Sequence, residues 1–310
     1  MKEDLNSRLG SSTTSEERGY LGSLTKRHLL PAVIAACVIS LACGGESAAP
    51  QPEETPTGTS TRLPGGLPTP TPSPSPTPVP LPELSAGDAI VVGGLVRTRA
   101  DPSTGAAPVS TIQDLAKVSI AAQVRGENWL IGSQTWVTSV PDWTYTWYQL
   151  GDGSYVYGAF VFILAEGEVS PLAAAQPGQE KWIDVALSEQ RARAMVGDQA
   201  VFVAPISSGS AQFPTPVGSF AVQRDGRLPV EKMTASQAGY QAEQAQYDVE
   251  RVLFTQYFDL SGDALHLNYW RPHSVFGRTP TSHGCIGLEL HEAQYLWLFA
   301  SAGTRVEIHQ

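Results

Sequence analysis

The sequence is poor in cysteine, in charge and in basic residues. Three cysteines among 310 residues cannot build a disulfide-rich fold. Charged residues are only 16% of the chain against 42% hydrophobic residues, a balance that excludes a largely disordered protein and an all-membrane protein. The formal net charge of −10 supplies no basic surface for phosphate groups, so no nucleic-acid partner is expected.

The N-terminal apolar stretch is short for a membrane-spanning helix. Leu29–Leu41 holds 13 mostly apolar residues, whereas a bilayer-spanning helix needs about 20. It follows the basic residues 26–28 and suits the hydrophobic region of a signal peptide. The continuation to Cys43 resembles a bacterial lipoprotein signal, in which cleavage precedes a cysteine that is then lipidated. Residues 1–43 are therefore expected to be an export leader with lipidation at Cys43; the alternatives are plain cleavage, an uncleaved anchor, or lipidation at Cys37.

Residues 44–84 have the composition of a linker. Residues 50–82 hold 12 of the 24 prolines of the chain, alternating with Thr and Ser. This pattern cannot form a helix and lacks the donors for a sheet. At about 3.1 Å per residue, an extended spacer of this length reaches on the order of 100 Å. We expect a stalk without a specific ligand.

Residues 85–168 are predicted to be short strands separated by Gly and Asp turns, a pattern typical of a small barrel. The segments 147–150 and 155–158 resemble the end of bacterial SH3-type domains, and Leu95–Arg99 resembles their opening strand. The resemblance implies an SH3-like domain that binds cell-wall peptides. The alternative is a structural spacer whose tryptophans are core residues. The tryptophans in question are Trp136, Trp143 and Trp147, and the predicted strands are 89–92, 118–121, 129–131, 146–150 and 154–157.

A short linker, 169–179, precedes a second β-rich domain at 180–310, so the whole chain is predicted to be mostly β with one or two helices. Residues 231–247 are polar and Gln/Ala-rich, which favours a helical or irregular insertion. An apolar pattern at helical spacing predicts a helix over 288–299. The predicted strands are 182–188, 191–196, 200–204, 252–258, 265–267 and 305–308.

The residues with catalytic potential lie near Cys285, the cysteine outside the N-terminal leader. Cys285 follows Ser282, His283 and Gly284, and His266 lies upstream. A free thiol has a pKa of about 8.5, so a neighbouring imidazole is needed to take its proton. A glycine beside the thiol allows close approach, and backbone amides there can hold an oxyanion. This pattern predicts a cysteine acyltransferase; the alternative is a buried, inert cysteine.

This pattern looks like the active-site signature of the L,D-transpeptidase (YkuD) catalytic domain. Further resemblances lie at 182–190, 207–209 and 213–220. The family implies a β-sandwich-like fold with the cysteine in a cleft and no metal or organic cofactor. Its members act on peptidoglycan stem peptides: a donor tetrapeptide loses D-Ala to form a thioester, and an acceptor amine then resolves it.

The resemblance assigns roles residue by residue. It implies Cys285 as the nucleophile, His266 as its base, and His283 as a residue that shapes the pocket. Ser282 then supplies a hydroxyl for an imidazole, and the Gly284 and Cys285 amides supply oxyanion donors. The implied substrate-binding residues are Tyr269, Trp270, Phe276 and Arg278.

Two positions depart from the family pattern. Gly287 stands where members usually carry Asn or Arg, and Leu267 stands where Gly or Ser is usual. Arg278 is a candidate to replace the missing polar group; the alternative is a solvated loop charge.

The expected protein is thus a monomeric, extracytoplasmic L,D-transpeptidase, tethered to the membrane by a lipid and facing the cell wall. Two alternatives remain open. Water can replace the acceptor amine, which gives an L,D-carboxypeptidase or endopeptidase. The departures at positions 267 and 287 also allow a non-catalytic wall-binding lipoprotein.

Overall fold

The computed structural model describes residues 80–132, 134, 136–137, 139–234 and 248–310. The predictions for the leader at 1–43, for Cys43 and Cys37, and for the linker up to residue 79 lie outside the described residues. Within the described ranges the chain is mostly β with one α-helix, as predicted. None of the helices in these ranges is long and apolar enough to cross a membrane.

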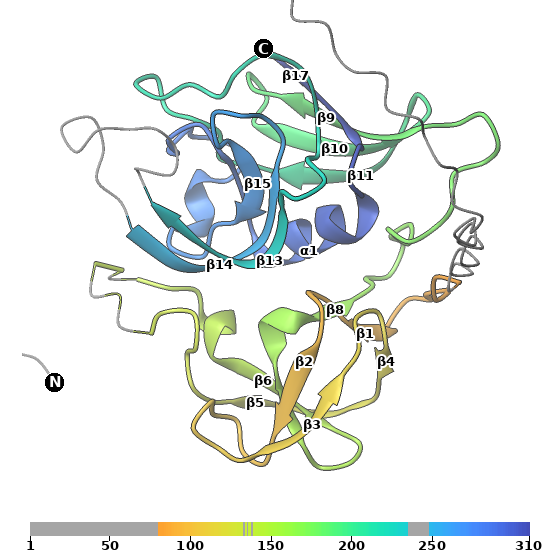
Figure 1. The fold of residues 1–310 in the computed structure, drawn as a ribbon, viewed down its shortest axis with the longest axis vertical. Helices are drawn as coiled ribbons and strands as arrows, with labels where there is room; N and C mark the ends of the chain where they lie inside the picture. Colours follow the sequence, from red (N-terminus) through yellow and green to blue (C-terminus); the bar gives the residue numbers. More distant parts are fainter. Residues whose placement is uncertain (1–79, 133, 135, 138, 235–247) are drawn as a thin grey trace, which may run out of the picture. The chain divides into compact units, whose positions relative to one another are not determined.

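The N-terminal segment, residues 80–168, folds into two antiparallel sheets (Figure 1). One sheet has the strand order β4-β1-β8 and the other has the order β3-β2-β7-β6-β5. Its strands are β1 (Ala89–Val91), β2 (Val96–Arg99), β3 (Pro108–Ile112), β4 (Lys117–Val118), β5 (Ile120–Arg125), β6 (Thr146–Leu150), β7 (Tyr155–Tyr157) and β8 (Val161–Ile163). The identity of this segment as an SH3-like domain stays a prediction.

Two sequence expectations for this segment fail. Residues 129–131, predicted as a strand, lie in turns. Trp136 is 48% exposed, whereas Trp147 is 2% exposed and donates its indole N–H to the Glu127 carbonyl at 2.9 Å. Trp147 is therefore a core residue with a satisfied polar atom, and Trp136 is a surface residue.

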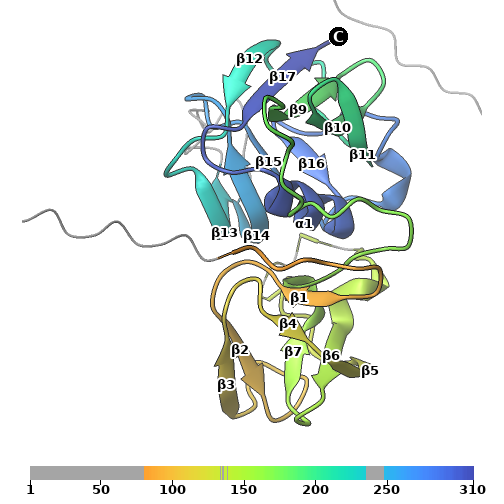
Figure 2. The same ribbon diagram turned by 90° about the vertical axis from the view of Figure 1, so that its right-hand side faces the viewer.

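The C-terminal segment, residues 180–310, contains a five-stranded sheet in the order β11-β10-β9-β17-β12 and a four-stranded sheet in the order β13-β14-β15-β16. Figure 2 shows β9, β10 and β11 side by side. The strands are β9 (Lys181–Ala186), β10 (Arg191–Val196), β11 (Gln199–Pro205), β12 (Gly218–Ala221), β13 (Arg227–Thr234), β14 (Asp248–Tyr257), β15 (Ala264–Leu267), β16 (Ile286–Leu288) and β17 (Arg305–His309).

The one α-helix of the described residues, α1 (Leu290–Phe299), is buried on several sides. Tyr295 stacks on Phe202 of β11 with ring centroids 3.7 Å apart, and Trp297 lies 5.9 Å from Phe254 of β14. The helix thus packs against both sheets. It begins two residues later than predicted because Leu288 belongs to β16.

The predicted helical or irregular insertion at 231–247 is wrong for its first residues. Residues 231–234 belong to β13, which pairs with β14 in antiparallel register. Met233 of this strand is buried in an apolar cluster with Val249 and Val252. Pairing with β14 and this burial override the polar composition. Residues 235–247 lie outside the described residues.

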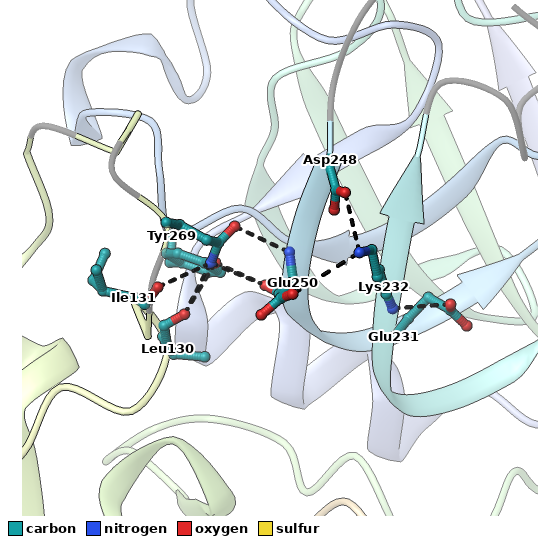
Figure 3. Close-up of polar contacts among 8 residues, drawn as sticks. Leu130, Ile131, Glu231, Lys232, Asp248, Glu250 and Tyr269 are labelled. Atoms are coloured by element: carbon teal, nitrogen blue, oxygen red, sulfur yellow. Dashed lines mark hydrogen bonds and ion pairs between the residues drawn. The ribbon is translucent and has the colours of Figure 1, made fainter.

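The two segments belong to one compact unit, Pro74–Gln310, and share one hydrophobic core. Polar contacts also join them (Figure 3). The Tyr269 hydroxyl accepts from Gln134 Nε2 at 2.7 Å and donates to the Glu250 carbonyl at 2.8 Å. Gln134 Oε1 accepts the Glu250 amide at 3.0 Å. Gln134 and Tyr269 therefore tie a loop of the N-terminal segment to β14.

Candidate active site

The nucleophile candidate and the base candidate meet on two adjacent parallel strands. β15 and β16 pair in parallel, with His266 opposite Gly287. Cys285 immediately precedes β16, two positions before Gly287. Side chains two residues apart on a strand share a face, and so do paired residues of neighbouring strands. The sheet therefore presents Cys285 and His266 on the same face.

The turn that carries Cys285 is held by the segment 207–215. The Ser282 amide donates to the Ser208 carbonyl at 3.0 Å. The Thr215 hydroxyl donates to the Gly284 carbonyl at 2.6 Å, while it accepts the Gly209 amide at 2.8 Å. Position 209 must be glycine, because a Cβ there would lie 2.2 Å from the Phe213 carbonyl oxygen. Through these hydrogen bonds, the sequence elements at 207–209 and 213–220 both hold the turn that carries Cys285.

Ser282 and Gly284 are bonded within the turn itself. The Ser282 hydroxyl donates to the Cys285 carbonyl and accepts the Gly284 amide at 3.2 Å. The Ser282 hydroxyl thus bonds the backbone of its own turn, where the sequence predicted a bond to an imidazole. The Gly284 amide, predicted as an oxyanion donor, is occupied in this conformation. Gly284 has φ +120°, which favours glycine.

Asp263 closes the other side of the turn. A Cβ at Gly284 would lie 2.1 Å from Asp263 Oδ1, so the carboxylate rests directly against the residue before the nucleophile. Burial, followed by the Asp259 charge, raises the pKa of Asp263 to about 6. The Cys285 thiol donates to the Gly262 carbonyl at 3.9 Å. The loop between β14 and β15 therefore surrounds the thiol with oxygen atoms.

This environment disfavours the thiolate form of Cys285. Burial, with the nearby Asp263 carboxylate as the next cause, raises the pKa of Cys285 to about 12. The Tyr257 side chain on β14 is also part of these surroundings, since burial and the Glu231 and Cys285 charges raise its pKa to about 12. A carboxylate beside a sulfur disfavours the thiolate because like charges repel.

His266 is a neutral imidazole with one ring nitrogen free to accept a proton. Its ring is 3% exposed, and burial lowers its pKa to about 4. Nδ1 lies 2.8 Å from the Leu267 carbonyl and donates to it, which leaves Nε2 as the acceptor. Trp270 stacks on the ring with centroids 5.6 Å apart and fixes its plane.

A thiol whose pKa is raised and an imidazole whose pKa is lowered share this face of the sheet. Both shifts favour the uncharged forms of the two groups, for which general-base activation of the thiol is the matching chemistry. The chemistry this site can perform is acyl transfer to a cysteine.

The predicted substrate-binding residues separate into different environments. Trp270 stacks on His266, and its role in substrate binding stays a prediction. Tyr269 is 1% exposed with its hydroxyl bonded to Gln134 and Glu250, and Phe276 is 6% exposed. Arg278 lies exposed on its loop. The structure thus gives Tyr269 and Phe276 packing positions. His283 is partly buried with its ring 4.4 Å from that of Phe213.

Sequence reasoning missed Asp263, Tyr257 and Asn268. Asn268 stands two residues after His266, and strand alternation alone would have put it on the catalytic face. No nearby sequence pattern indicates Asp263, because its contact with Gly284 joins residues that are 21 positions apart in the chain. Among the described residues, no group of three or more His, Cys, Asp or Glu is arranged to hold a metal ion.

The fold and the site define a mostly β protein with a cysteine and a histidine on one sheet face. Residues 180–308 match the model of the YkuD family, which is the L,D-transpeptidase catalytic domain. The resemblance predicted for the C-terminal segment is thereby confirmed at the level of the domain. No curated protein matches the chain.

Solved structures of L,D-transpeptidases also match. The LD transpeptidase LdtMt1 in complex with imipenem is 17% identical with a TM-score of 0.39 and aligns over 53% of this chain and 66% of its own. The L,D-transpeptidase from Mycobacterium smegmatis is 19% identical with a TM-score of 0.39, over 53% and 66%. L,D-transpeptidase 3 from Mycobacterium tuberculosis is 15% identical with a TM-score of 0.38, over 73% and 83%. The chain thus spans just under two thirds of the first two structures, and these values are too low to bear on residue roles.

Proposed function

We propose that this protein is a peptidoglycan L,D-transpeptidase with Cys285 as its nucleophile. The supporting observation is the parallel pairing of β15 and β16, which puts Cys285 and the neutral His266 on one face. It occurs within the residues that match the L,D-transpeptidase catalytic domain.

The proposed reaction has two half-reactions. In the first, His266 Nε2 takes the thiol proton as sulfur bonds to the carbonyl carbon of the donor peptide. The C–N bond to the terminal D-Ala breaks, and the departing amine takes the proton from His266. In the second, an acceptor amine attacks the thioester and gives a proton to His266, the C–S bond breaks, and the departing sulfur takes that proton to regenerate the thiol.

The environment of the thiol is compatible with a slower enzyme. A thiol with a pKa of about 12 depends entirely on His266 at the moment of attack, since almost no thiolate exists near neutral pH. This observation favours, as a second candidate, a non-catalytic wall-binding lipoprotein in which residues 85–168 bind the wall and the C-terminal domain has lost efficient chemistry.

The remaining parts of the chain fit a wall-facing enzyme. We infer that residues 1–43 export the protein with a lipid on Cys43 and that 44–84 form a stalk to the folded part. Residues 85–168 act as an SH3-like wall-binding domain. The proposed substrates are peptidoglycan stem peptides, and the chain acts as an extracytoplasmic monomer without a cofactor.

Intact-mass spectrometry tests the catalytic proposal. The whole chain, purified in detergent, is mixed with a disaccharide-tetrapeptide that ends in D-Ala, and both protein and muropeptide masses are followed. We expect a transient adduct on the wild type, absent from Cys285→Ala, and cross-linked dimers that lack D-Ala.

Other outcomes identify the alternatives. An adduct that yields only trimmed monomers identifies a carboxypeptidase. Absence of both adduct and product, from protein with an intact circular dichroism spectrum, contradicts catalysis and leaves wall binding. A pull-down on purified peptidoglycan by Cys285→Ala then measures that binding directly.

A further inference from the structure

Gly287 leaves space on the catalytic face of β16. It lies two residues after Cys285 and opposite His266, so a side chain there would share the face of both. Both its backbone groups are occupied, because its amide donates to the Ser207 carbonyl at 3.0 Å and its carbonyl accepts the Ser207 amide at 3.0 Å. Position 287 is therefore fixed inside the sheet without a side chain of its own.

The side chain of Asn268 occupies this space from the neighbouring strand. A Cβ built on Gly287 would lie 2.7 Å from Asn268 Nδ2 and 3.1 Å from Asn268 Cβ. The backbone N–H of Asn268 donates to the Leu288 carbonyl at 2.8 Å, which extends the β15–β16 ladder by one residue. Asn268 therefore shares the face of His266, two positions away.

The carboxamide oxygen of Asn268 lacks a hydrogen-bond donor among the residues that the structure describes. The residue is 3% exposed, and its Oδ1 is buried with no hydrogen-bond partner among the described residues. A buried acceptor without a donor costs free energy, and native proteins retain such groups rarely. The side chain lies against Gly287, two residues after Cys285, so a peptide bound at the thiol is the nearest source of an N–H for this oxygen.

We propose that Asn268 binds the acyl-donor peptide in the position that a side chain at residue 287 would take, with its free carboxamide oxygen accepting an N–H of the donor backbone. This inference rests on the proposed function, and it names the residue that orients the donor. Arg278, the sequence-based candidate for this task, lies exposed on its loop.

Three variants of the whole chain in detergent test the proposal. Asn268→Leu keeps the approximate volume and removes the carboxamide. The double variant Asn268→Gly with Gly287→Asn moves the carboxamide from β15 to β16. Asn128→Leu is the matched control, because the Asn128 amide donates to the Thr144 hydroxyl at 2.8 Å within the N-terminal segment.

Each variant is measured in three ways: thioester formation with the tetrapeptide, alkylation of Cys285 by iodoacetamide, and thermal unfolding. For Asn268→Leu we expect kcat/KM for acylation to fall about tenfold, mostly through KM, which is the loss expected for one neutral hydrogen bond. Alkylation stays unchanged and the Tm stays equal or rises, because an unpaired buried acceptor has been removed. The double variant recovers acylation to within about threefold of the wild type, and Asn128→Leu acylates like the wild type.

Three results overturn the proposal. Unchanged acylation by Asn268→Leu would show that Asn268 does not contact the substrate. A parallel fall in alkylation would show that the substitution acts on the reactivity of the thiol. A lower Tm with no recovery in the double variant would show that Asn268 is a structural residue. If the wild type itself forms no thioester while iodoacetamide still labels Cys285, the proposed function fails, and this inference fails with it. That result is distinct, because failure of the inference alone leaves wild-type acylation intact.

Discussion

Two buried carboxamides, Gln134 and Asn268, face opposite situations in the same molecule. Gln134, 8% exposed, donates to the Tyr269 hydroxyl and accepts the Glu250 amide, so it joins the two segments (Figure 3). Asn268, 3% exposed, keeps its oxygen unpaired among the described residues and lies against Gly287, two residues after the candidate nucleophile. A polar group that holds a structure together is satisfied within it, whereas a group that holds a substrate must wait for its partner.

The same contrast extends to the charged groups. The Arg193–Asp184 pair lies at 2.9 Å and raises the pKa of the guanidinium. Asp263 and Cys285, in contrast, have the pKa of each acid raised by burial and by a neighbouring negative charge. The site thus contains groups whose pKa values differ from their ordinary values, as is common in active sites.

The largest expected effect is the loss of chemistry in Cys285→Ala. The sulfur is the atom that forms the thioester, so acylation by the tetrapeptide should become undetectable. Intact-mass spectrometry measures the adduct, and an unchanged Tm shows that folding survives. Residual adduct formation in this variant would show that another nucleophile operates.

His266→Gln should lower the acylation rate by about 10²- to 10⁴-fold, since a general base contributes in this range. The wild-type pH profile sharpens this assignment. The buried His266 has a pKa of about 4, so it remains neutral, and able to accept a proton, down to about pH 4. The acid limb of kcat/KM should therefore have its midpoint near 4 and should be lost in the variant. A midpoint near 6.5 would indicate a solvated histidine as the base.

The two carboxamides can be compared directly by removing each. Gln134→Met should lower the free energy of unfolding by about 2 kcal/mol, because the Glu250 amide and the Tyr269 hydroxyl lose a partner. Asn268→Leu should leave the free energy unchanged or raise it. Urea unfolding at pH 7 measures both. Equal losses in the two variants would show that Asn268 has a structural partner and would erase the contrast.

Asp263→Asn should raise the free energy of unfolding by about 2 kcal/mol at pH 7 and by less than about 1 kcal/mol at pH 4. The folded pKa of about 6 lies above the ordinary value of 3.8, so the folded protein binds the proton more tightly. The wild type therefore gains stability as the pH falls from 6 towards 4, and the uncharged variant shows no such gain.

The same variant should also speed alkylation. Loss of the Asp263 charge lowers the pKa of the Cys285 thiol, so iodoacetamide should react faster at pH 8. Asp259→Asn is the matched control, because the Asp259 charge raises the thiol pKa less than that of Asp263. Equal alkylation rates in Asp263→Asn and the wild type would show that the Asp263 charge does not affect the thiol.

The smallest effect is expected at the exposed ion pairs near Gln134. Lys232 lies 3.0 Å from Asp248 and 3.9 Å from Glu250, with half of its side chain exposed (Figure 3). Lys232→Ala should change the free energy of unfolding by less than about 0.5 kcal/mol, since solvent screens such pairs. A loss comparable to that of Gln134→Met would show that this ion pair also fastens the interface.

The predicted features that the structure reproduces are those with a local signal. The helix over 288–299 was found because its apolar residues follow one helical pattern, although it begins at Leu290. The strand predicted at 129–131 failed because a buried Leu130 with apolar neighbours indicates burial without indicating conformation. The prediction of an insertion was wrong for residues 231–234, because their pairing with β14 outweighs their polar composition.

The candidate site divides in the same way. Cys285 and His266 were predicted through a motif that can be recognised along the chain. Asn268 and Asp263 were not, because each is defined by a glycine on another segment that leaves room for it. Tyr269 was expected at the substrate and lies in the interface, since its hydroxyl bonds to Gln134.

By itself, the sequence determined the mostly β class, the position of the helix and the identities of the candidate nucleophile and base, because strand alternation, helical periodicity and short motifs are local properties. The tertiary structure alone decided which polar groups remain without partners and which charges raise the pKa of Cys285. These depend on contacts between residues distant in the chain, such as Asn268 against Gly287 and Asp263 against Gly284. Burial and unpaired polar atoms arise only when the sheets and loops pack together.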